Sequence, residues 1–464
     1  MEERILKKLS EIVESASIFT SKEELLCHSC DATRRSSLPE VVVLPESAEQ
    51  VAAIAKLCTE EGVPLTPRGA GTGLSGGAIP LSGGVSLSLI RMNKIREIVS
   101  EDLYVVVEAG VVTEELKKTV EAASLFYPPD PTSLKSSTIG GNIGTSARGL
   151  RSLKYGGTRN YLMGLEIVLP TGDVMKTGAR TVKSVAGYDL TRLICGSEGT
   201  LAIVTSAILK LLPLPEHRVT ILAAYPTLEK AAEASHNVIS HGSTPSILEI
   251  MDSLTVELIS RNIALPPGVE GRSLVLAETD GFRDAAEKEA DRIEKVFSDC
   301  GAMFVEKIAE QGAQERMWEA RRGVLTALAK LKPVTVLEDV TVPRSRVVEM
   351  IRSIAETGRK HELLIATFGH GGEGNLHPTI LVDGPISENA PRLEAAVMEI
   401  YETALSLGGT LSSEHGIGIE KTSFLKKEIG EFPFETMKRL KDAFDPRGIL
   451  NPGKLFALDP GSRF

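Results

Sequence analysis

The chain has 464 residues, of which 42% are hydrophobic, 25% are charged and 4% are aromatic. This length allows two or three domains with buried cores, and the composition is typical of a soluble protein. Lys and Arg number 52 against 62 Asp and Glu, which gives a net charge of −10, and basic residues come at most in pairs. Without a basic patch to neutralise a phosphate backbone, nucleic acid is not an expected partner.

The N-terminal residues 1–8 (MEERILKK) are charged and amphipathic and lack the apolar core of a secretory signal. The best apolar run, 201–209, contains Thr205 and Ser206 and is far shorter than a membrane span. We expect a cytoplasmic chain with no transmembrane segment, or one held peripherally at a membrane through a partner.

Five scattered cysteines do not predict a disulfide framework. Cys27 and Cys30 form a C-x-x-C pair, a spacing found in redox pairs and in half-sites for metals. No second pair completes zinc or iron–sulfur ligation, so a structural role is favoured and any cluster that carries electrons is expected on another protein.

The first predicted unit is a strand, a helix and a second strand. The run 41–44 (VVVL) is typical of a buried strand, and Ser47 with Gln50 forms a capping box before apolar residues at helical spacing. Gly62 ends the helix, and a strand at 63–66 leads into a glycine-rich stretch.

That stretch, residues 67–77, reads PRGAGTGLSGG and is typical of a loop that holds a phosphate, since clustered glycines turn main-chain N–H groups toward an anion. Residues 71–76 also match G-x-G-x-x-G, the fingerprint of a dinucleotide-binding fold. Pro80 makes a following helix improbable, and Arg91 stands where an acid is needed. We therefore reject binding of NAD at this loop.

A second unit begins with a valine-rich strand at 105–107 and a helix from Thr113 to about Ala123. It continues through Asp-Pro-Thr-Ser at 130–133 to a second predicted glycine loop at 140–145 (GGNIGT). A strand at 165–169 follows and ends at a predicted turn, 170–173 (PTGD). Either glycine cluster alone is explained by tight turns.

Together, PRGAGTGLSGG and the DPTS…STIGGNIGTSARG segment resemble the FAD-binding domain of vanillyl-alcohol-oxidase type flavoproteins. The resemblance is to the FAD-linked D-2-hydroxyacid dehydrogenase family, which holds D-lactate dehydrogenases and the glycolate oxidase catalytic subunit. In that family both segments bind the FAD pyrophosphate and adenosine through backbone. The cofactor-binding residues that the resemblance implies are Arg68, Gly69, Ala70, Gly71, Thr72, Gly73, Leu74, Ser75, Pro131, Thr132, Gly140, Gly141, Asn142, Gly144, Thr145, Ser146, Glu198, Gly199, Ile203 and Asn451.

Two further segments resemble the same flavin domain. The run 185–205 follows the family closely, with Ala202 where glycine is usual, and 444–454 resembles the C-terminal return to the flavin. Between Cys58 and Cys195 there is no His or Cys to bond the isoalloxazine, so we expect noncovalent FAD.

The proline-containing stretch 212–216 (LPLPE) is expected to stop any regular element and to mark a domain boundary. Beyond it, strands such as 219–224 and 274–278 alternate with charged helices such as 285–297, which indicates an antiparallel sheet with helices on one face. The predicted fold class is α+β, a two-subdomain FAD-binding domain of vanillyl-alcohol-oxidase type with such a cap. The predicted domains are 1–213 for FAD, 214–420 for the substrate and metal cap, and 421–464 for a segment returning to the flavin.

Three of the eight histidines fall in residues 368–378 (FGHGGEGNLHP) and 413–416 (SEHG). Two imidazoles and a carboxylate suit a divalent metal such as Zn²⁺ and leave coordination positions open for substrate. Paired histidines in glycine-rich loops also occur as hydrogen-bonding residues, so the residues alone leave both interpretations open.

The family resemblance implies that His370, His377 and Glu414 are metal ligands and that His415 is the general base. The expected ion is Zn²⁺, with Mn²⁺ or Fe²⁺ as alternatives. Glu373 is the other acid in this region, but the resemblance points to Glu414.

The family also places the arginine three residues after a tryptophan on the substrate carboxylate, which here follows Trp318 and indicates Arg321. A solvated helix face is the alternative, and the neighbouring Arg322 is a competitor for the role. Asn375 is a further expected substrate-binding residue.

Leu325 and Leu337 stand where the hydroxyglutarate enzymes are expected to have a polar residue and a lysine, so a monocarboxylate such as D-lactate or glycolate is favoured. The mechanism implied is chelation of the acid by the metal, proton removal from the 2-hydroxyl by His415, and hydride transfer from C2 to flavin N5.

The electron acceptor is left open among an iron–sulfur subunit, an electron-transfer flavoprotein, a quinone and oxygen.

Two alternatives to this function also stay open. One is a flavoenzyme of the same fold with other chemistry, such as alkyl-dihydroxyacetone-phosphate synthase or an aldonolactone oxidase. The other is a noncatalytic FAD-binding subunit of a redox complex, which would have no need of the histidine and glutamate set.

Overall fold

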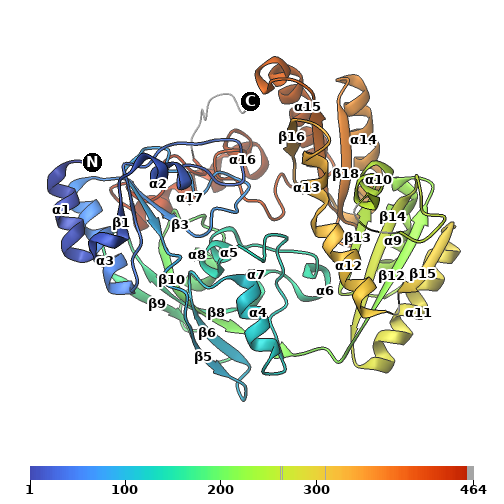
Figure 1. Ribbon diagram of the computed structural model, residues 1–464, viewed down its shortest axis with the longest axis horizontal. Coiled ribbons are helices and arrows are strands. Elements are labelled where there is room, and N and C mark those ends of the chain that lie inside the picture. Colours follow the sequence, from blue (N-terminus) through green and yellow to red (C-terminus); the bar gives the residue numbers. More distant parts are fainter. Residues whose placement is uncertain (262, 264, 309, 457–464) are drawn as a thin grey trace. The chain divides into compact units, whose positions relative to one another are not determined.

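The computed structural model describes residues 1–456 except 262, 264 and 309, and its backbone divides into two compact units (Figure 1). Among the described residues, the first unit comprises 1–149, 156–214 and 414–456. The second comprises 150–155 and 215–413. No helix in the described part of the chain combines the length and apolarity that crossing a membrane requires.

The first unit begins with a four-stranded sheet in the order β1-β2-β4-β3. Strand β4 pairs in parallel with both β2 and β3. The predicted helix is confirmed as α3 (Ala48–Glu61): Ser47 accepts the backbone N–H of Gln50, and Gly62 ends the helix with φ +67°. The strands and remaining helices here are β1 (Ile18–Phe19), β2 (Val41–Val43), β3 (Leu65–Arg68), β4 (Val85–Ser88), α1 (Glu3–Ile12), α2 (Lys22–Cys27) and η1 (Ser15–Ser17).

A five-stranded antiparallel sheet, ordered β5-β6-β10-β8-β9, forms the rest of the first unit's sheet structure together with a short strand pair, β7 and β11. Its elements are β5 (Ile95–Val99), β6 (Tyr104–Glu108), α4 (Thr113–Glu121), β7 (Leu125–Phe126), α5 (Ile139–Thr145), α7 (Thr158–Tyr161), β8 (Leu162–Val168), β9 (Val174–Gly178), α8 (Leu190–Ile194), β10 (Ile203–Lys210), β11 (Leu212–Pro213), α16 (Thr422–Ile429) and α17 (Glu431–Phe444).

Two local predictions in this unit are wrong. The second glycine stretch is not a loop but the helix α5, because Thr138 caps it by accepting the Gly141 N–H and Asn142 donates to Thr113 Oγ1 at 2.7 Å. The proline-containing stretch also begins with a regular element, since Leu212 and Pro213 form β11 against β7. Proline is tolerated at such a sheet edge.

The second unit is built on an eight-stranded sheet whose pairs are all antiparallel. Seven strands follow the order β15-β12-β14-β13-β18-β19-β16, and β17 also pairs with β19 (Figure 1). They are β12 (His217–Tyr225), β13 (Ile247–Met251), β14 (Ser273–Gly281), β15 (Phe304–Ile308), β16 (Val334–Leu337), β17 (Val340–Thr341), β18 (Leu364–His370) and β19 (Asn375–Val382).

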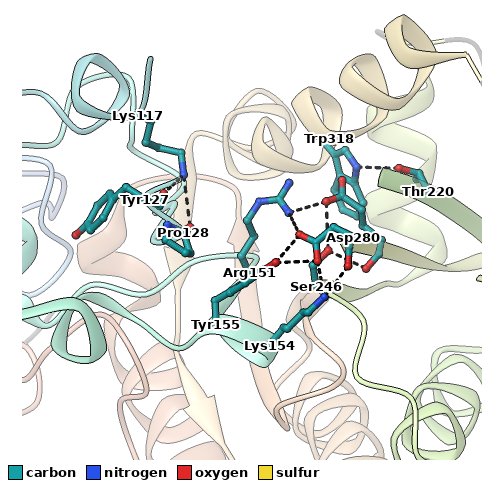
Figure 2. A network of polar contacts seen from close by, with 11 residues as sticks. Lys117, Tyr127, Pro128, Arg151, Lys154, Tyr155, Thr220, Ser246, Asp280 and Trp318 are labelled. Atoms are coloured by element: carbon teal, nitrogen blue, oxygen red, sulfur yellow. Dashed lines mark hydrogen bonds and ion pairs between the residues drawn. The ribbon is translucent and has the colours of Figure 1, made fainter. Parts of the chain in front are cut away.

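The core of the second unit gathers apolar side chains from strands and helices around Trp318, whose indole N–H donates to Thr220 Oγ1 at 3.2 Å (Figure 2). Alternate residues of β13, Ile247 and Met251, belong to this core, so the residue between them on the same face, Glu249, also points into it. The helices of the unit are α6 (Ser152–Tyr155), α9 (Leu228–Ser240), α10 (Ser253–Ser260), α11 (Arg283–Asp299), α12 (Gln311–Arg322), α13 (Val324–Ala329), η2 (Arg344–Arg346), α14 (Val347–Lys360) and α15 (Ile386–Ser406).

Residues 150–155 belong to the second unit because polar contacts tie them to β14 (Figure 2). Lys154 Nζ lies 2.6 Å from Asp280 Oδ1, and the Tyr155 hydroxyl donates to the same carboxylate at 2.9 Å. Arg151 pairs with Glu278 at 2.6 Å. All three contacts reach buried carboxylates, which explains why this short segment groups with the sheet.

Candidate functional site

The first glycine stretch follows directly on the carboxyl end of β3 and contains turns and bends but no helix, as the rejection of an NAD fingerprint requires. Gly71 and Gly76 adopt φ values of +71° and +80°, a region that side chains with a Cβ rarely enter. The guanidinium of Arg68 folds beneath the loop and donates to the carbonyl of Cys30 at 2.7 Å. Glycine-rich loops of this kind can turn backbone N–H groups toward an anion.

The two glycine stretches meet in the folded first unit. A Cβ added at Gly69 would lie 2.3 Å from Thr138 Oγ1, the N-cap of α5, and 3.8 Å from the Cα of Gly141. A Cβ at Gly140 would come within 2.7 Å of the Ala109 Cβ. At Gly144, by contrast, an added Cβ would meet nothing within 4 Å. The glycines therefore permit close backbone packing on one side of α5 and leave an open surface at Gly144.

A buried acid holds other segments to the first glycine stretch. The Glu198 carboxylate accepts the Ile417 N–H at 2.8 Å and the Ser75 hydroxyl at 3.4 Å. Burial raises the pKa of Glu198, although the N–H groups of Ile417 and Gly418 oppose the shift. The segment that carries His415 is thus anchored two residues later, at Ile417.

The C-terminal segment also returns to this stretch. Asn451 Nδ2 donates to the carbonyls of Glu198 and Gly77 at 2.8 and 2.9 Å. The buried Lys454 donates to the carbonyls of Gly76 and Ile79, both at 2.7 Å, and burial lowers its pKa to about 8. Side chains far away in the sequence therefore hold the glycine stretch in place through hydrogen bonds to its backbone carbonyls.

The remaining cofactor-binding candidates lie in the same unit. Pro131 accepts the Leu134 N–H within a turn, and Thr132 is exposed. Ser146 ends α5 with φ +53°, and Ile203 is buried at the start of β10. The side-chain amide of Asn142 is occupied by Thr113, so any part it takes in binding a cofactor uses its backbone.

In the second unit, the hairpin β18–β19 brings His370 and His377 together. His370 pairs with Asn375 across the hairpin, and His377 lies two residues further along β19, so both imidazoles project from the same face. Their ring centroids are 5.4 Å apart, and the side chains are 8% and 5% exposed. Glycine is required in the turn at Gly374, which adopts φ +84° and where an added Cβ would lie 2.2 Å from the backbone carbonyl oxygen of Val342.

His370, His377 and Glu414 each offer a ligand atom, and these atoms all lie within 4.8 Å of one another. Glu414 directly follows Ser413, whose N–H and hydroxyl donate to the buried Asp339 at 2.9 and 2.7 Å. Two nitrogen donors and one carboxylate at such spacing fit a divalent ion with open coordination positions. The donor set thus fits the metal that the sequence predicted there.

His415 follows Glu414, with Nε2 3.7 Å from the Glu414 carboxylate, too far for a hydrogen bond. Its side chain is 11% exposed. Asn375, the other predicted substrate residue, uses its amide nitrogen to bond Asp339 at 2.7 Å and the Val340 carbonyl at 3.1 Å.

The structure adds a residue that sequence reasoning missed. Glu249 in β13 is fully buried; one carboxylate oxygen pairs with Arg321 and the other accepts from His370 Nδ1 at 2.5 Å. Burial pushes the pKa of Glu249 upward, but the Arg321 guanidinium and His370 outweigh it and hold that pKa below its ordinary value. An acid inside the apolar run Ile-Leu-Glu-Ile-Met was the available signal.

Arg321 lies at the end of α12 and is 3% exposed, so it is not a solvated surface arginine. Its guanidinium carbon lies 4.8 Å from the centroid of the Phe368 ring. Beyond its contact with Glu249, the Nε–H is buried and has no hydrogen-bond partner among the described residues. A buried, unsatisfied donor of this kind suits an anionic ligand.

Sequence comparison finds two family models in the chain. "FAD binding domain" matches residues 39–178, and "FAD linked oxidases, C-terminal domain" matches residues 214–455. The glycolate oxidase subunit GlcD of Bacillus subtilis is 44% identical over 94% of this chain and 93% of its own length. The GlcD subunit of Escherichia coli K12 is 34% identical over 97% and 90%, and a D-lactate dehydrogenase of Anaerostipes hadrus is 36% identical over 90% and 89%.

Comparison with solved structures confirms the predicted fold class. A p-cresol methylhydroxylase matches with a TM-score of 0.81 at 17% identity, covering 97% of this chain and 96% of that one. A 4-ethylphenol oxidase from Gulosibacter chungangensis matches at 0.78 and 19%, covering 98% and 96%. At these identities the likeness concerns the vanillyl-alcohol-oxidase type fold alone.

Proposed function

The chain belongs to the FAD-linked oxidoreductase family of the glycolate oxidase subunits and D-lactate dehydrogenases, and from that premise we propose that it oxidises a small D-2-hydroxy acid with the help of a divalent metal. The observation that carries the proposal is the group of ligand atoms on His370, His377 and Glu414, all within 4.8 Å of one another. A noncatalytic scaffold has no need of it.

We assign FAD to the first unit, where the two glycine stretches meet and Gly144 leaves an open surface. The attachment is noncovalent, because no histidine or cysteine lies between Cys58 and Cys195, and both of these cysteines are buried. Burial raises the pKa of the Cys58 thiol to about 12, which leaves it a poor nucleophile.

A direct consequence concerns Gly144→Ala. We expect the variant to be purified with less FAD than the wild type, because the added methyl occupies the space assigned to the cofactor. The apoprotein should be as stable as wild type or slightly more, since Ala favours a helix over Gly by about 1 kcal/mol and meets nothing within 4 Å. Flavin absorbance per protein and the melting temperature of the apoprotein test this. If the variant is purified with as much FAD as the wild type, the assignment of FAD to this surface is wrong.

When bound, the flavin supplies a two-electron acceptor and the metal, Zn²⁺ or else Mn²⁺ or Fe²⁺, supplies a Lewis acid for the 2-hydroxyl. His370, His377 and Glu414 would hold the ion. Arg321 binds the substrate carboxylate through the Nε edge of its guanidinium, which is buried without a partner among the described residues. The Phe368 ring lies against the guanidinium of this arginine, with the ring centroid 4.8 Å from the guanidinium carbon.

His415 removes the proton of the 2-hydroxyl as hydride leaves C2. A neutral imidazole near physiological pH is suited to this role, because its unperturbed pKa of about 6.5 lies close to the working pH. The His415 side chain is 11% exposed, so it is partly accessible to solvent. Asn375, fixed by Asp339, completes the proposed substrate contacts.

The acid is proposed to be a monocarboxylate, D-lactate or glycolate. Leu337 in β16 packs against the apolar core of the second unit, and Leu325 in α13 is partly buried. Neither side chain carries a charge for a second carboxylate. In a dye-reduction assay we expect turnover with D-lactate or glycolate, and a markedly lower kcat/KM with L-lactate and D-2-hydroxyglutarate. Preference for D-2-hydroxyglutarate would contradict the assignment of substrate size.

The proposed acceptor is another protein, an iron–sulfur subunit or an electron-transfer flavoprotein, or a quinone. The relatives named GlcD are themselves described as subunits, which supports a partner protein. A cytoplasmic location, or a peripheral one through that partner, is part of the same proposal.

A further inference from the structure

Glu249 is a charged side chain at a buried core position, where the stability of the fold does not require a charge. It lies in the middle of β13, on the face that carries the core residues Ile247 and Met251, and it is 0% exposed. Placing a carboxylate there carries a large desolvation cost, and an apolar residue of similar volume often gives equal or greater stability. The position therefore requires an explanation beyond packing.

Each oxygen of the Glu249 carboxylate has a hydrogen-bond partner. One pairs with Arg321 and the other accepts from His370 Nδ1 at 2.5 Å. A carboxylate can only accept, so the hydrogen of the neutral His370 ring must sit on Nδ1. The lone pair of that imidazole is then on Nε2, the nitrogen left for a metal ion.

We propose that Glu249 is the positioning residue of the metal site, which fixes the tautomer and ring orientation of His370 and so presents Nε2 to the ion. The inference deepens the proposed function, because it rests on His370 being a ligand. A carboxylate on the far nitrogen of a ligating imidazole makes the ring more basic and holds it in place, and its loss costs about 10- to 100-fold in metal affinity.

Arg321 has a separate part in this arrangement. It neutralises Glu249 from the side away from His370, and its own Nε faces no partner among the described residues. If the pair existed only to stabilise the fold, removal of either member would harm the metal site alike. If Glu249 positions His370, removal of Arg321 takes a positive charge from the neighbourhood of the ion and should not weaken binding.

The test is the affinity of the FAD-containing, chelator-treated protein for Zn²⁺, measured by competition with a chromophoric chelator at pH 8. We expect Glu249→Gln to lower the affinity about 10- to 100-fold. We expect no fall in Arg321→Met. The matched control is Glu278→Gln, which breaks another buried glutamate–arginine pair of the same sheet, with Arg151 at 2.6 Å, and should also leave the affinity unchanged.

Equal losses in Glu249→Gln and Arg321→Met, or no greater loss in Glu249→Gln than in Glu278→Gln, would overturn the proposal. If the wild-type protein binds no Zn²⁺, the metal-assisted part of the proposed function is wrong, independently of the role of Glu249. If Glu249→Gln does not fold, the imidazole ¹⁵N spectrum of the wild type decides. The signals lost in His370→Gln should report hydrogen on Nδ1, and hydrogen on Nε2 would contradict the positioning role.

Discussion

Replacing His415 with alanine should slow reduction of the bound flavin by D-lactate or glycolate about 10²- to 10⁴-fold, the usual contribution of a positioned general base. The expected cause is that no other group takes the 2-hydroxyl proton as hydride leaves. FAD content and Zn²⁺ affinity should stay close to wild type, because His415 is assigned neither to the flavin nor to the ion. Stopped-flow absorbance under anaerobic conditions measures the rate.

The control for this variant is His361→Ala. His361 lies at the end of α14 and pairs with Glu399 at 3.0 Å, outside the proposed site. It should reduce its flavin at the wild-type rate. If the His415→Ala protein retains FAD and its flavin is reduced as fast as that of this control, His415 is not the general base.

Removing the metal should have an effect of similar size. Chelation is expected to lower the rate of flavin reduction at least about a hundredfold, since a Lewis acid on the hydroxyl oxygen supplies several kcal/mol and each 1.36 kcal/mol is a factor of ten. Added Zn²⁺ or Mn²⁺ should restore the rate. Glu414→Gln should behave like the chelated protein at low metal concentration, because it removes the charged ligand of the group.

A neighbouring acid provides the matched control for Glu414. Glu373 lies in the turn between the two histidines, but the Ser152 hydroxyl donates to its carboxylate and it is not a member of the ligand group. Glu373→Gln should keep metal affinity. If it loses the metal while Glu414→Gln retains it, the roles of the two glutamates are exchanged.

Local sequence signals predicted the parts of the fold that depend on short-range chemistry. Ser47, Gln50 and Gly62 define the ends of α3 because their capping bonds lie within a few residues. The β18–β19 hairpin was not among these predictions, although the glycines between His370 and His377 allow its tight turn. The glycine stretch at 140–145 was misjudged, since helix propensity argues against glycine and the cap at Thr138 overrides it.

The environment of Arg321 could not be predicted in the same way. Its partner Glu249 is 72 residues earlier in the chain, and His370, which shares this carboxylate, comes 121 residues after Glu249. Only the packing of α12, β13 and β18 around one core places them in contact. The same holds for Asp339, whose bonds to Asn375 and Ser413 join three segments that no periodicity relates. Assignment of the ligand and base roles came from family resemblance and stays a prediction.

The most direct test of the account is anaerobic mixing of the purified flavoprotein with D-lactate or glycolate, with no acceptor present, before and after treatment with a chelator. The account predicts bleaching of the flavin absorbance by one of these acids, loss of the bleaching on chelation, and recovery with Zn²⁺ or Mn²⁺. Flavin that is bound but stays oxidised with every 2-hydroxy acid would contradict the enzymatic function proposed here. Bleaching that is unchanged after the metal has been stripped would contradict the role of His370, His377 and Glu414.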